Sequence, residues 1–244
     1  THPLPLTDKE AAALAEYNKY DVAATVRMAC QTLAGQWETR CGFAEMLGPK
    51  KFAWHKTFTK LAAELFVDKP ELKMEKDDTS WMQTITQFPK CLRIEKHTGL
   101  LNYFSKPLFE LELREFSTQV NGVPHVFKIG GAHSVNGRAV YKGDIWDIDV
   151  SGMYPSLMCL FNLCSRTMDA KKYNEVRMAR MAMAKSDWRR NVYKQALNST
   201  YGGTLESFST LFDPAKGRQV CVLGQLFIVD LLEKLEPYVT LIQT

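Results

Sequence analysis

The stretch that decides the fold is "DIWDIDVSGMYPSLM", residues 144–158, in which acidic and apolar side chains alternate ahead of a glycine. Successive side chains of a β-strand point to opposite faces, so Asp147 and Asp149 would share one face. The other face would enter a core with the apolar residues Trp146, Ile148 and Val150. The alternation therefore predicts a strand that is buried on one face and carries two carboxylates on the other.

The residues after this strand predict a turn into a helix. Gly152 would break the strand, Tyr154 is held extended by the proline that follows it, and Pro155 suits the first turn of a helix. Carboxylates at such a junction can hold Mg²⁺, which binds one or two protein carboxylates and leaves its other positions to water and phosphate oxygens. The alternative is an edge strand protected by its charges. A tyrosine buried at the corner favours the binding site, because an edge strand does not need one.

The composition indicates a globular protein. The 244 residues, of which 45% are hydrophobic, suit one large domain or two small ones with a real core. No apolar run approaches the length of a membrane span and no signal peptide is recognised, so no membrane partner is expected. The six cysteines are scattered without metal-ligand spacing, which predicts reduced thiols in an intracellular protein.

Positive charge is concentrated in one part of the chain. The net charge is +4, and residues 165–220 hold eleven Lys or Arg against five Asp or Glu. A basic segment beside a nearly neutral remainder favours a polyanionic ligand. A solvated charged face is the alternative explanation.

The basic segment contains a helix with a stripe of polar side chains. "SDWRRNVYKQALNSTYGGT", residues 186–204, is predicted to begin at Ser186 or Asp187 and to end at Gly202-Gly203. The helical period aligns four side chains that suit phosphate, sugar and base, namely Arg190, Lys194, Asn198 and Tyr201. A basic helix over about 169 to 185 would pack antiparallel to it and complete a two-helix projection. The alternative is a solvated hairpin with a methionine-lined inner face.

Elsewhere the pattern predicts an α+β fold of antiparallel character. A capping box of Thr7 and Glu10 would start a helix that Gly35 ends, and residues 36–80 are mostly helical. Strands and turns then follow, with strands at "CLRIEK", "LLNYF" and "FELELREF" and Asn-Gly hairpin turns at 121–122 and 136–137. A long apolar helix over 217–235 precedes a last strand that begins near Val239.

Two of these pieces resemble motifs of the family B (Pol α-like) DNA polymerases. "DVSGMYPS", from Asp149, resembles motif A, D-x-x-S-L-Y-P-S, with Gly152 and Met153 in place of its serine and leucine. "KQALNSTYG", from Lys194, fits motif B, K-x-x-x-N-S-x-Y-G, at every defined position. The order of the motifs and the short gap between them are similar to the compact fingers of phage polymerases, the protein-primed ones among them.

Two shorter pieces extend the resemblance. "YNKYDVAAT", from Tyr17, resembles the third motif of the family's 3′–5′ proofreading exonuclease, Y-x-x-x-D. "KIGGAHS", from Lys128, resembles the Y-x-G-G/A element that holds the primer end, with Lys128 where the tyrosine would stand. All four pieces occur in the family's order, which chance would rarely produce.

The resemblance implies roles for the residues of a polymerase site. Asp149 would bind the catalytic metals with help from the Val150 carbonyl, whereas Asp147 lies outside the motif. Tyr154 would stack under the incoming sugar and exclude a 2′-hydroxyl. In motif B, Lys194 would hold the triphosphate together with Arg190. Asn198 and Tyr201 would line the pocket of the nascent base pair. The chemistry would be phosphoryl transfer assisted by two Mg²⁺ ions.

The resemblance also implies roles away from that site. Asp21 would be the metal-binding acid of the exonuclease, and Tyr17 would orient the attacking water. Lys128, Gly130 and Gly131 would contact the DNA. Primer–template DNA and dNTP are the expected partners, and the host cytoplasm is the expected location if the protein is phage-encoded.

By this resemblance the chain is a portion of a larger enzyme. Its expected fold is α+β, a polymerase palm with an antiparallel sheet and a two-helix fingers projection. The C-terminal part of a 3′–5′ exonuclease domain would precede the palm. The expected parts are an exonuclease-like 1–80, linking and palm-entry strands 81–143, palm with motif A 144–168, fingers 169–203, and a palm helix with the start of the motif C strand 204–244. Motif C, the thumb and the rest of the exonuclease would come from the same or another chain, so this portion alone is expected to be inactive.

Two other hypotheses compete with the polymerase. The first is a non-catalytic remnant of a polymerase that binds nucleic acid or nucleotide through the basic fingers. The second is a structural protein in which the motifs are coincidental. Mg²⁺-dependent primer extension by the complete assembly distinguishes the polymerase from both.

Overall fold

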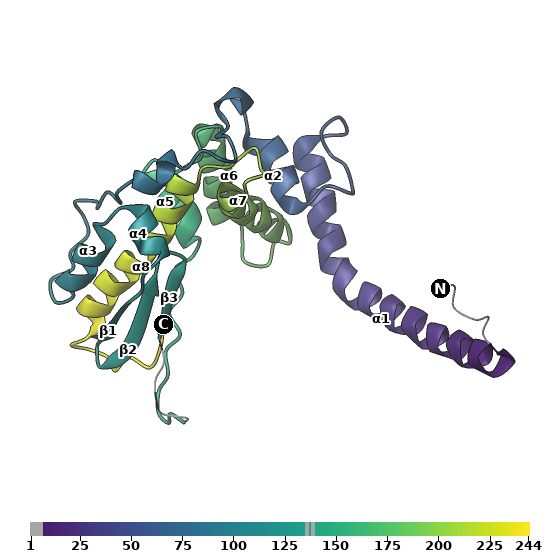
Figure 1. The fold of residues 1–244 in the computed structure, drawn as a ribbon, viewed down its shortest axis with the longest axis horizontal. Coiled ribbons are helices and arrows are strands. Elements are labelled where there is room, and N and C mark those ends of the chain that lie inside the picture. The colour runs from purple at the N-terminus through teal and green to yellow at the C-terminus, as the bar shows by residue number, and fades with distance from the viewer. Residues whose placement is uncertain (1–6, 135–136, 138–139) are drawn as a thin grey trace. The chain divides into compact units, whose positions relative to one another are not determined.

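The computed structural model describes residues 7–134, 137 and 140–244, without the side chains of 32–34. The chain forms two compact units, residues 1–54 and 55–244 (Figure 1). The described residues form a mixed α+β structure with one three-stranded antiparallel sheet, which confirms the fold class at that level. The boundary between the units falls after Trp54, well before residue 80, where the sequence places the end of the first domain.

The first unit is dominated by one long helix, α1 (Asp8–Leu47), drawn in purple in Figure 1. It begins as predicted with a capping box, in which the Thr7 N–H donates to the Glu10 carboxylate at 2.9 Å. The prediction that Gly35 ends the helix is wrong. A single internal glycine costs only about 1 kcal/mol, and the glycine that ends the helix is Gly48, at φ 71°.

The second unit is built around packed helices. These are α2 (Phe58–Phe66), α5 (Met153–Leu160), α6 (Ala170–Ala182), α7 (Arg189–Leu205) and α8 (Pro214–Leu235). Tyr173 of α6 is fully buried between α2 and α7, where its hydroxyl donates to the Leu197 carbonyl at 3.1 Å and its ring meets Phe66 edge-on. Gly203 lets α7 approach α2 closely, because a Cβ there would lie 3.0 Å from Thr59. The helical pair α6–α7 is therefore fixed on a rigid support.

The sheet has the strand order β1 (Phe116–Val120), β2 (Val123–Lys128), β3 (Gly131–Ser134). The predicted hairpin at Asn121-Gly122 is confirmed, since both residues have positive φ, 49° and 77°. The sheet packs on α8, as Figure 1 shows, and the Gln225 amide of α8 donates to the Lys128 carbonyl at 2.8 Å. The predicted hairpin turn at 136–137 falls largely on positions outside the described residues.

The strands predicted between 91 and 116 are wrong. "LLNYF" lies in α3 (Thr98–Phe104). "FELELREF", residues 109–116, begins within α4 (Leu108–Glu112) and only its last residue, Phe116, is in β1. "CLRIEK" has no strand partner among the described residues. Short 3₁₀ helices at Pro70–Leu72 and Ser80–Gln83 precede them. Leu100 and Phe104 are both fully buried. Their spacing of four residues fits one face of a helix, so these short apolar runs are ambiguous in sequence.

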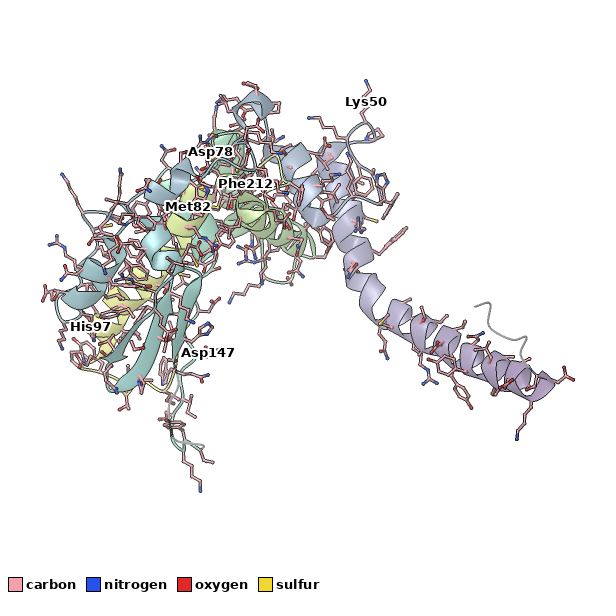
Figure 2. All side chains as sticks on the ribbon, viewed as in Figure 1. Lys50, Asp78, Met82, His97, Asp147 and Phe212 are labelled. Carbon is pink, nitrogen blue, oxygen red and sulfur yellow. The ribbon has the colours of Figure 1, made fainter. Side chains whose placement is uncertain are left out.

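The strand predicted at the start of "DIWDIDVSGMYPSLM" is also wrong. In the described part of the chain, residues 144–150 pair with no strand, and Trp146 is 82% exposed. The apolar side chains expected in a core therefore lie in solvent, and the Asp147 side chain stands clear of the helices (Figure 2). The predicted turn into a helix after Gly152 is confirmed, because Gly152 adopts φ 65° and α5 begins at Met153. The prediction that the proline holds Tyr154 extended is wrong, because Tyr154 already lies within α5. The last strand, expected from Val239, is likewise not formed.

No helix in the portion of the chain that the structure describes combines the length and the hydropathy of a membrane-spanning segment.

Candidate nucleotide-binding site

Two tyrosines bring the two polymerase-like motifs together. Tyr154 opens α5 and Tyr201 lies near the end of α7, and their ring centroids are 4.6 Å apart with an interplanar angle of 58°. The Tyr154 hydroxyl also lies 3.5 Å from the Cys221 sulfur of α8. Burial, together with Cys221, raises the pKa of both phenols, so they stay neutral. Motifs that are far apart in sequence thus meet at one aromatic pair.

Two glycines determine where Tyr154 lies. Gly152 turns the chain at φ 65° and its carbonyl accepts from the Ser156 N–H at 3.0 Å, which starts α5. Gly224 of α8 leaves room for the ring, because a Cβ there would lie 3.1 Å from Tyr154 Cε1. The tyrosine is therefore held by backbone geometry on both sides.

The stripe of polar side chains on α7 is a feature of one continuous helix. The predicted end at Gly202-Gly203 is wrong, since α7 runs on to Leu205. Tyr201 shares a helical face with Lys194 and Asn198 because the three residues are four and three positions apart. Both of those side chains are exposed, and neither has a hydrogen-bond partner within the described residues. They remain available to a ligand.

The turn between α6 and α7 is stabilised by side chains at the base of the stripe. Arg190 Nη1 donates to the Met183 carbonyl at 2.7 Å, which satisfies a carbonyl at the end of α6. At the start of α7, the Asp187 carboxylate accepts from the Arg189 N–H at 2.9 Å, as an N-capping side chain would, although the helix begins one residue later than expected. Arg190 thus has a structural role at the end of α6 that neighbours the stripe.

Arg180 of α6 is a site residue that the sequence did not single out. It is only 8% exposed, and its Nη1 would be 3.0 Å from a Cβ on Gly152. Burial, and then the nearby Arg190, lower the pKa of its guanidinium. Within the described residues, its Nε has no hydrogen-bond partner and neither arginine has a carboxylate within ion-pair distance. Two adjacent guanidinia without a counter-ion form a strong site for an anion.

A small pocket joins Tyr154 to the glycine turn of the sheet. It has a volume of about 170 Å³ and is lined by Tyr154 and Met153, by Gly224 and Gln225 of α8, and by Gly131. Lys128 pairs with Gly131 across the β2–β3 turn, and its ammonium lies 2.8 Å from the Glu115 carboxylate. Gly130 is exposed and Gly131 has φ 151°, a conformation that suits glycine. The "KIGGAHS" element, which begins at Lys128, therefore lies beside the motif A-like residues Met153 and Tyr154.

The carboxylates do not form a metal centre by themselves. Asp149 and Asp147 are exposed, and the Val150 carbonyl accepts from the Met153 N–H at 3.3 Å. No group of three His, Cys, Asp or Glu side chains suited to a metal occurs within the described ranges. Asp149 fits as one carboxylate ligand of a Mg²⁺ that also binds phosphate oxygens, but a two-ion site is not formed by these residues.

The exonuclease-like residues lie in the other unit. Tyr17 and Asp21 are four residues apart on α1 and therefore share a helical face. Both are exposed, Tyr17 by 61%. The described part of the first unit places no metal-binding cluster around them.

Comparison of the chain with protein-family models, with curated proteins and with solved structures gives no match. Function is therefore inferred from the residues of the site.

Proposed function

We propose that this chain is part of a DNA-directed DNA polymerase of the family B type, and that α5, α6 and α7 form its binding site for the incoming dNTP. The observation that carries the proposal is the pair of neighbouring arginines, Arg180 and Arg190, which have no carboxylate partner among the described residues. Arg180 also lies next to the turn at Gly152. A buried cation without a counter-ion is unfavourable, and a bound triphosphate relieves it.

The residues around the guanidinia divide the recognition of a nucleotide among them. Lys194 and Asn198 continue the stripe from Arg190 towards Tyr201, so the phosphates would lie at the arginine end and the base at the tyrosine end. The face of Tyr154 would contact the sugar, and its tight fit against Gly224 would leave no room for a 2′-hydroxyl. The stripe on α7 would therefore bind the phosphates and the base, while α5 would contact the sugar.

The metal requirement is met only in part by this chain. Mg²⁺ would bind Asp149 and the phosphates, and two such ions supply the charge stabilisation that phosphoryl transfer needs. The second carboxylate would come from outside the described residues, in the same or another chain. The chain by itself is therefore expected to bind dNTP without extending a primer.

The remaining motif-like residues are assigned to the DNA. Gly130, Gly131 and Lys128 would contact the primer near the pocket that Gly131 shares with Tyr154. Tyr17 and Asp21 would belong to a proofreading exonuclease, with Asp21 as a metal ligand and Tyr17 as the group that orients water.

Primer extension by the complete assembly tests the proposal. With Mg²⁺ and a primed template, Asp149→Ala is expected to abolish extension. Lys194→Ala is expected to raise KM for dNTP by tenfold or more, because a hydrogen bond to a charged group is worth about 1.5–3 kcal/mol. Arg189→Gln is the matched control, since its side chain lies on the same helix but pairs with Asp187 at 2.7 Å. Undiminished extension by the Asp149 variant would contradict the proposal.

A non-catalytic nucleotide-binding module is the second candidate. It is favoured by one observation, the lack of an acidic cluster around Asp149 in the part of the chain that is described. The two candidates share the anion site and differ in catalysis. Binding of dNTP without any extension by the complete assembly would support the second candidate and exclude the first.

A further inference from the structure

Two cysteines meet at the end of α5, away from the nucleotide site. Cys159 lies in the last turn of the helix, and Cys164 follows a sharp turn in which Asn162 has φ 55°. The Cys164 sulfur contacts the backbone carbonyl of Met158, the residue directly before Cys159, and each thiol shifts the pKa of the other. Cys164 is buried, and its sulfur donates to that carbonyl at 3.7 Å, whereas Cys159 is half-buried. One thiol of the pair is therefore accessible and the other is held behind it.

Cationic side chains surround this pair. Arg177 of α6 lines the same pocket as Cys159, and its charge acts on the Cys159 thiol; its Nη1 also donates to Ser156 Oγ at 3.3 Å. The other titratable or charged groups that face the pair are Lys171 and Tyr173 of α6 and Lys216 of α8, whose ammonium donates to the Cys164 carbonyl at 2.6 Å. No carboxylate of the described residues is among the groups that act on either thiol.

This environment favours the thiolate of the accessible cysteine. The hydrogen bond from Cys164 and the charge of Arg177 lower the pKa of Cys159 to about 7, although burial acts in the opposite direction. The same hydrogen bond and burial raise the pKa of Cys164. A low-pKa thiolate with a second thiol beside it is the arrangement found at redox-sensitive cysteines.

An open pocket gives small molecules access to Cys159. It has a volume of about 330 Å³, and its lining includes Cys159, Asn162, Lys171, Asn174 and Arg177. These polar and cationic groups can hydrogen-bond to the oxygens of a small oxidant.

We propose that Cys159 and Cys164 form an oxidation site, in which a hydroperoxide converts Cys159 to a sulfenic acid and Cys164 then closes a disulfide. In the first step the Cys159 sulfur attacks one peroxide oxygen, the O–O bond breaks, and the remaining oxygen leaves as an alcohol or water after taking up a proton. Sulfur loses two electrons and the peroxide gains them. In the second step the Cys164 sulfur gives up its proton and attacks the Cys159 sulfur, the S–O bond breaks, and water leaves. The site does not depend on the polymerase proposal.

Peptide mass spectrometry after treatment with hydrogen peroxide tests the disulfide. The folded protein is expected to lose two hydrogens in a cross-linked peptide pair containing Cys159 and Cys164, while Cys30 and Cys91 stay reduced. Cys164→Ser is expected to stop at the sulfenic acid, which dimedone traps on Cys159, and Cys159→Ser is expected to give neither product. Circular dichroism verifies that each variant is folded. Oxidation of Cys30 or Cys91 ahead of Cys159 in the folded wild-type protein would overturn the proposal.

The pH dependence of alkylation tests the role of Arg177 in the unmodified protein. The rate of iodoacetamide labelling at Cys159 is expected to rise with a midpoint near pH 7, and Arg177→Gln is expected to move that midpoint upward by roughly one pH unit. Ser156→Ala is the matched control, because it removes the Arg177–Ser156 hydrogen bond and keeps the charge. A wild-type midpoint at the value of an ordinary thiol, about 8.5, or equal shifts in the two variants, would contradict the assignment.

Discussion

The two halves of "DIWDIDVSGMYPSLM" behave differently in the folded chain. Residues 153–158 form a helix against α8 and are buried or half-buried, whereas residues 144–150 are exposed and pair with no strand among the described residues. Tyr154 therefore has a fixed position, while Asp149 is four residues before the helix begins at Met153. A nucleotide-binding surface can be complete within this chain while the metal site that would use it is not.

The largest expected effect tests the packing on which the nucleotide site rests. Tyr173→Ala is expected to cost about 3–5 kcal/mol of unfolding free energy, because it leaves a cavity between α2 and α7. Trp146→Ala removes an equally large ring from the exposed segment and is expected to change stability by less than about 0.5 kcal/mol. Urea denaturation measures both. Similar losses of unfolding free energy in the two variants would mean that residues 144–150 are packed in solution. That result would contradict the difference between the exposed segment and the buried helices.

A second test concerns the attachment of the loop before α3 to α8. The Glu233 carboxylate accepts from the N–H groups of Glu95, at 2.7 Å, and His97, at 2.9 Å. Burial acts to raise the pKa of Glu233, but these and neighbouring hydrogen bonds outweigh it and hold the pKa below its ordinary value. The resulting stabilisation is present above the unfolded-state pKa of about 4.3 and is lost as the pH falls through the folded-state pKa.

Glu233→Gln is therefore expected to lower stability at pH 7 by about 1–3 kcal/mol and to flatten the loss of stability on acidification. Thermal melts between pH 7 and pH 3 measure this. Glu236→Gln, which breaks an exposed ion pair with Lys96, is the control and is expected to change little. An unchanged acid profile in the Glu233 variant would show that this attachment is not needed.

A smaller effect is expected at the point where the two halves meet. Gly152→Ala places a Cβ in the left-handed region, at a cost of about 1 kcal/mol, and pushes on the Arg180 guanidinium. Gly122→Ala has the same backbone strain, at φ 77°, but its Cβ would meet no atom within 4 Å. Both variants should lose similar stability, and only the first should bind dATP more weakly in calorimetry. Equal dATP affinity in the two variants would show that Gly152 is not part of the proposed nucleotide site.

The sequence predicted those elements whose signals are local. The capping box at Thr7, the turn at Asn121-Gly122, the start of α5 after Gly152 and the helices α6, α7 and α8 all depend on neighbouring residues, and all are confirmed. The strands around Leu100 and Phe104 were wrong because a short apolar run fits a helix as well as a strand, and only tertiary packing decides between them.

The candidate site was predictable only in part, for the same reason. The stripe on α7 follows from the helical period, but its contact with Tyr154 depends on how α5 packs against α8. Arg180 is one of several cations on α6, and only the turn at Gly152 makes it the buried one. Alternation predicted a strand at 144–150, yet a strand also needs a partner, which no local pattern supplies.

We expect that Arg180 is kept buried for an anionic ligand rather than for the fold. Arg180→Met tests it with two readouts on one variant, thermal stability and calorimetric binding of dATP with Mg²⁺, with Arg189→Gln as the charge-matched control. We expect the melting temperature to stay the same or rise, because an unpaired buried cation is replaced by an apolar side chain, and dATP affinity to fall at least tenfold. A large loss of stability with unchanged affinity would contradict the claim.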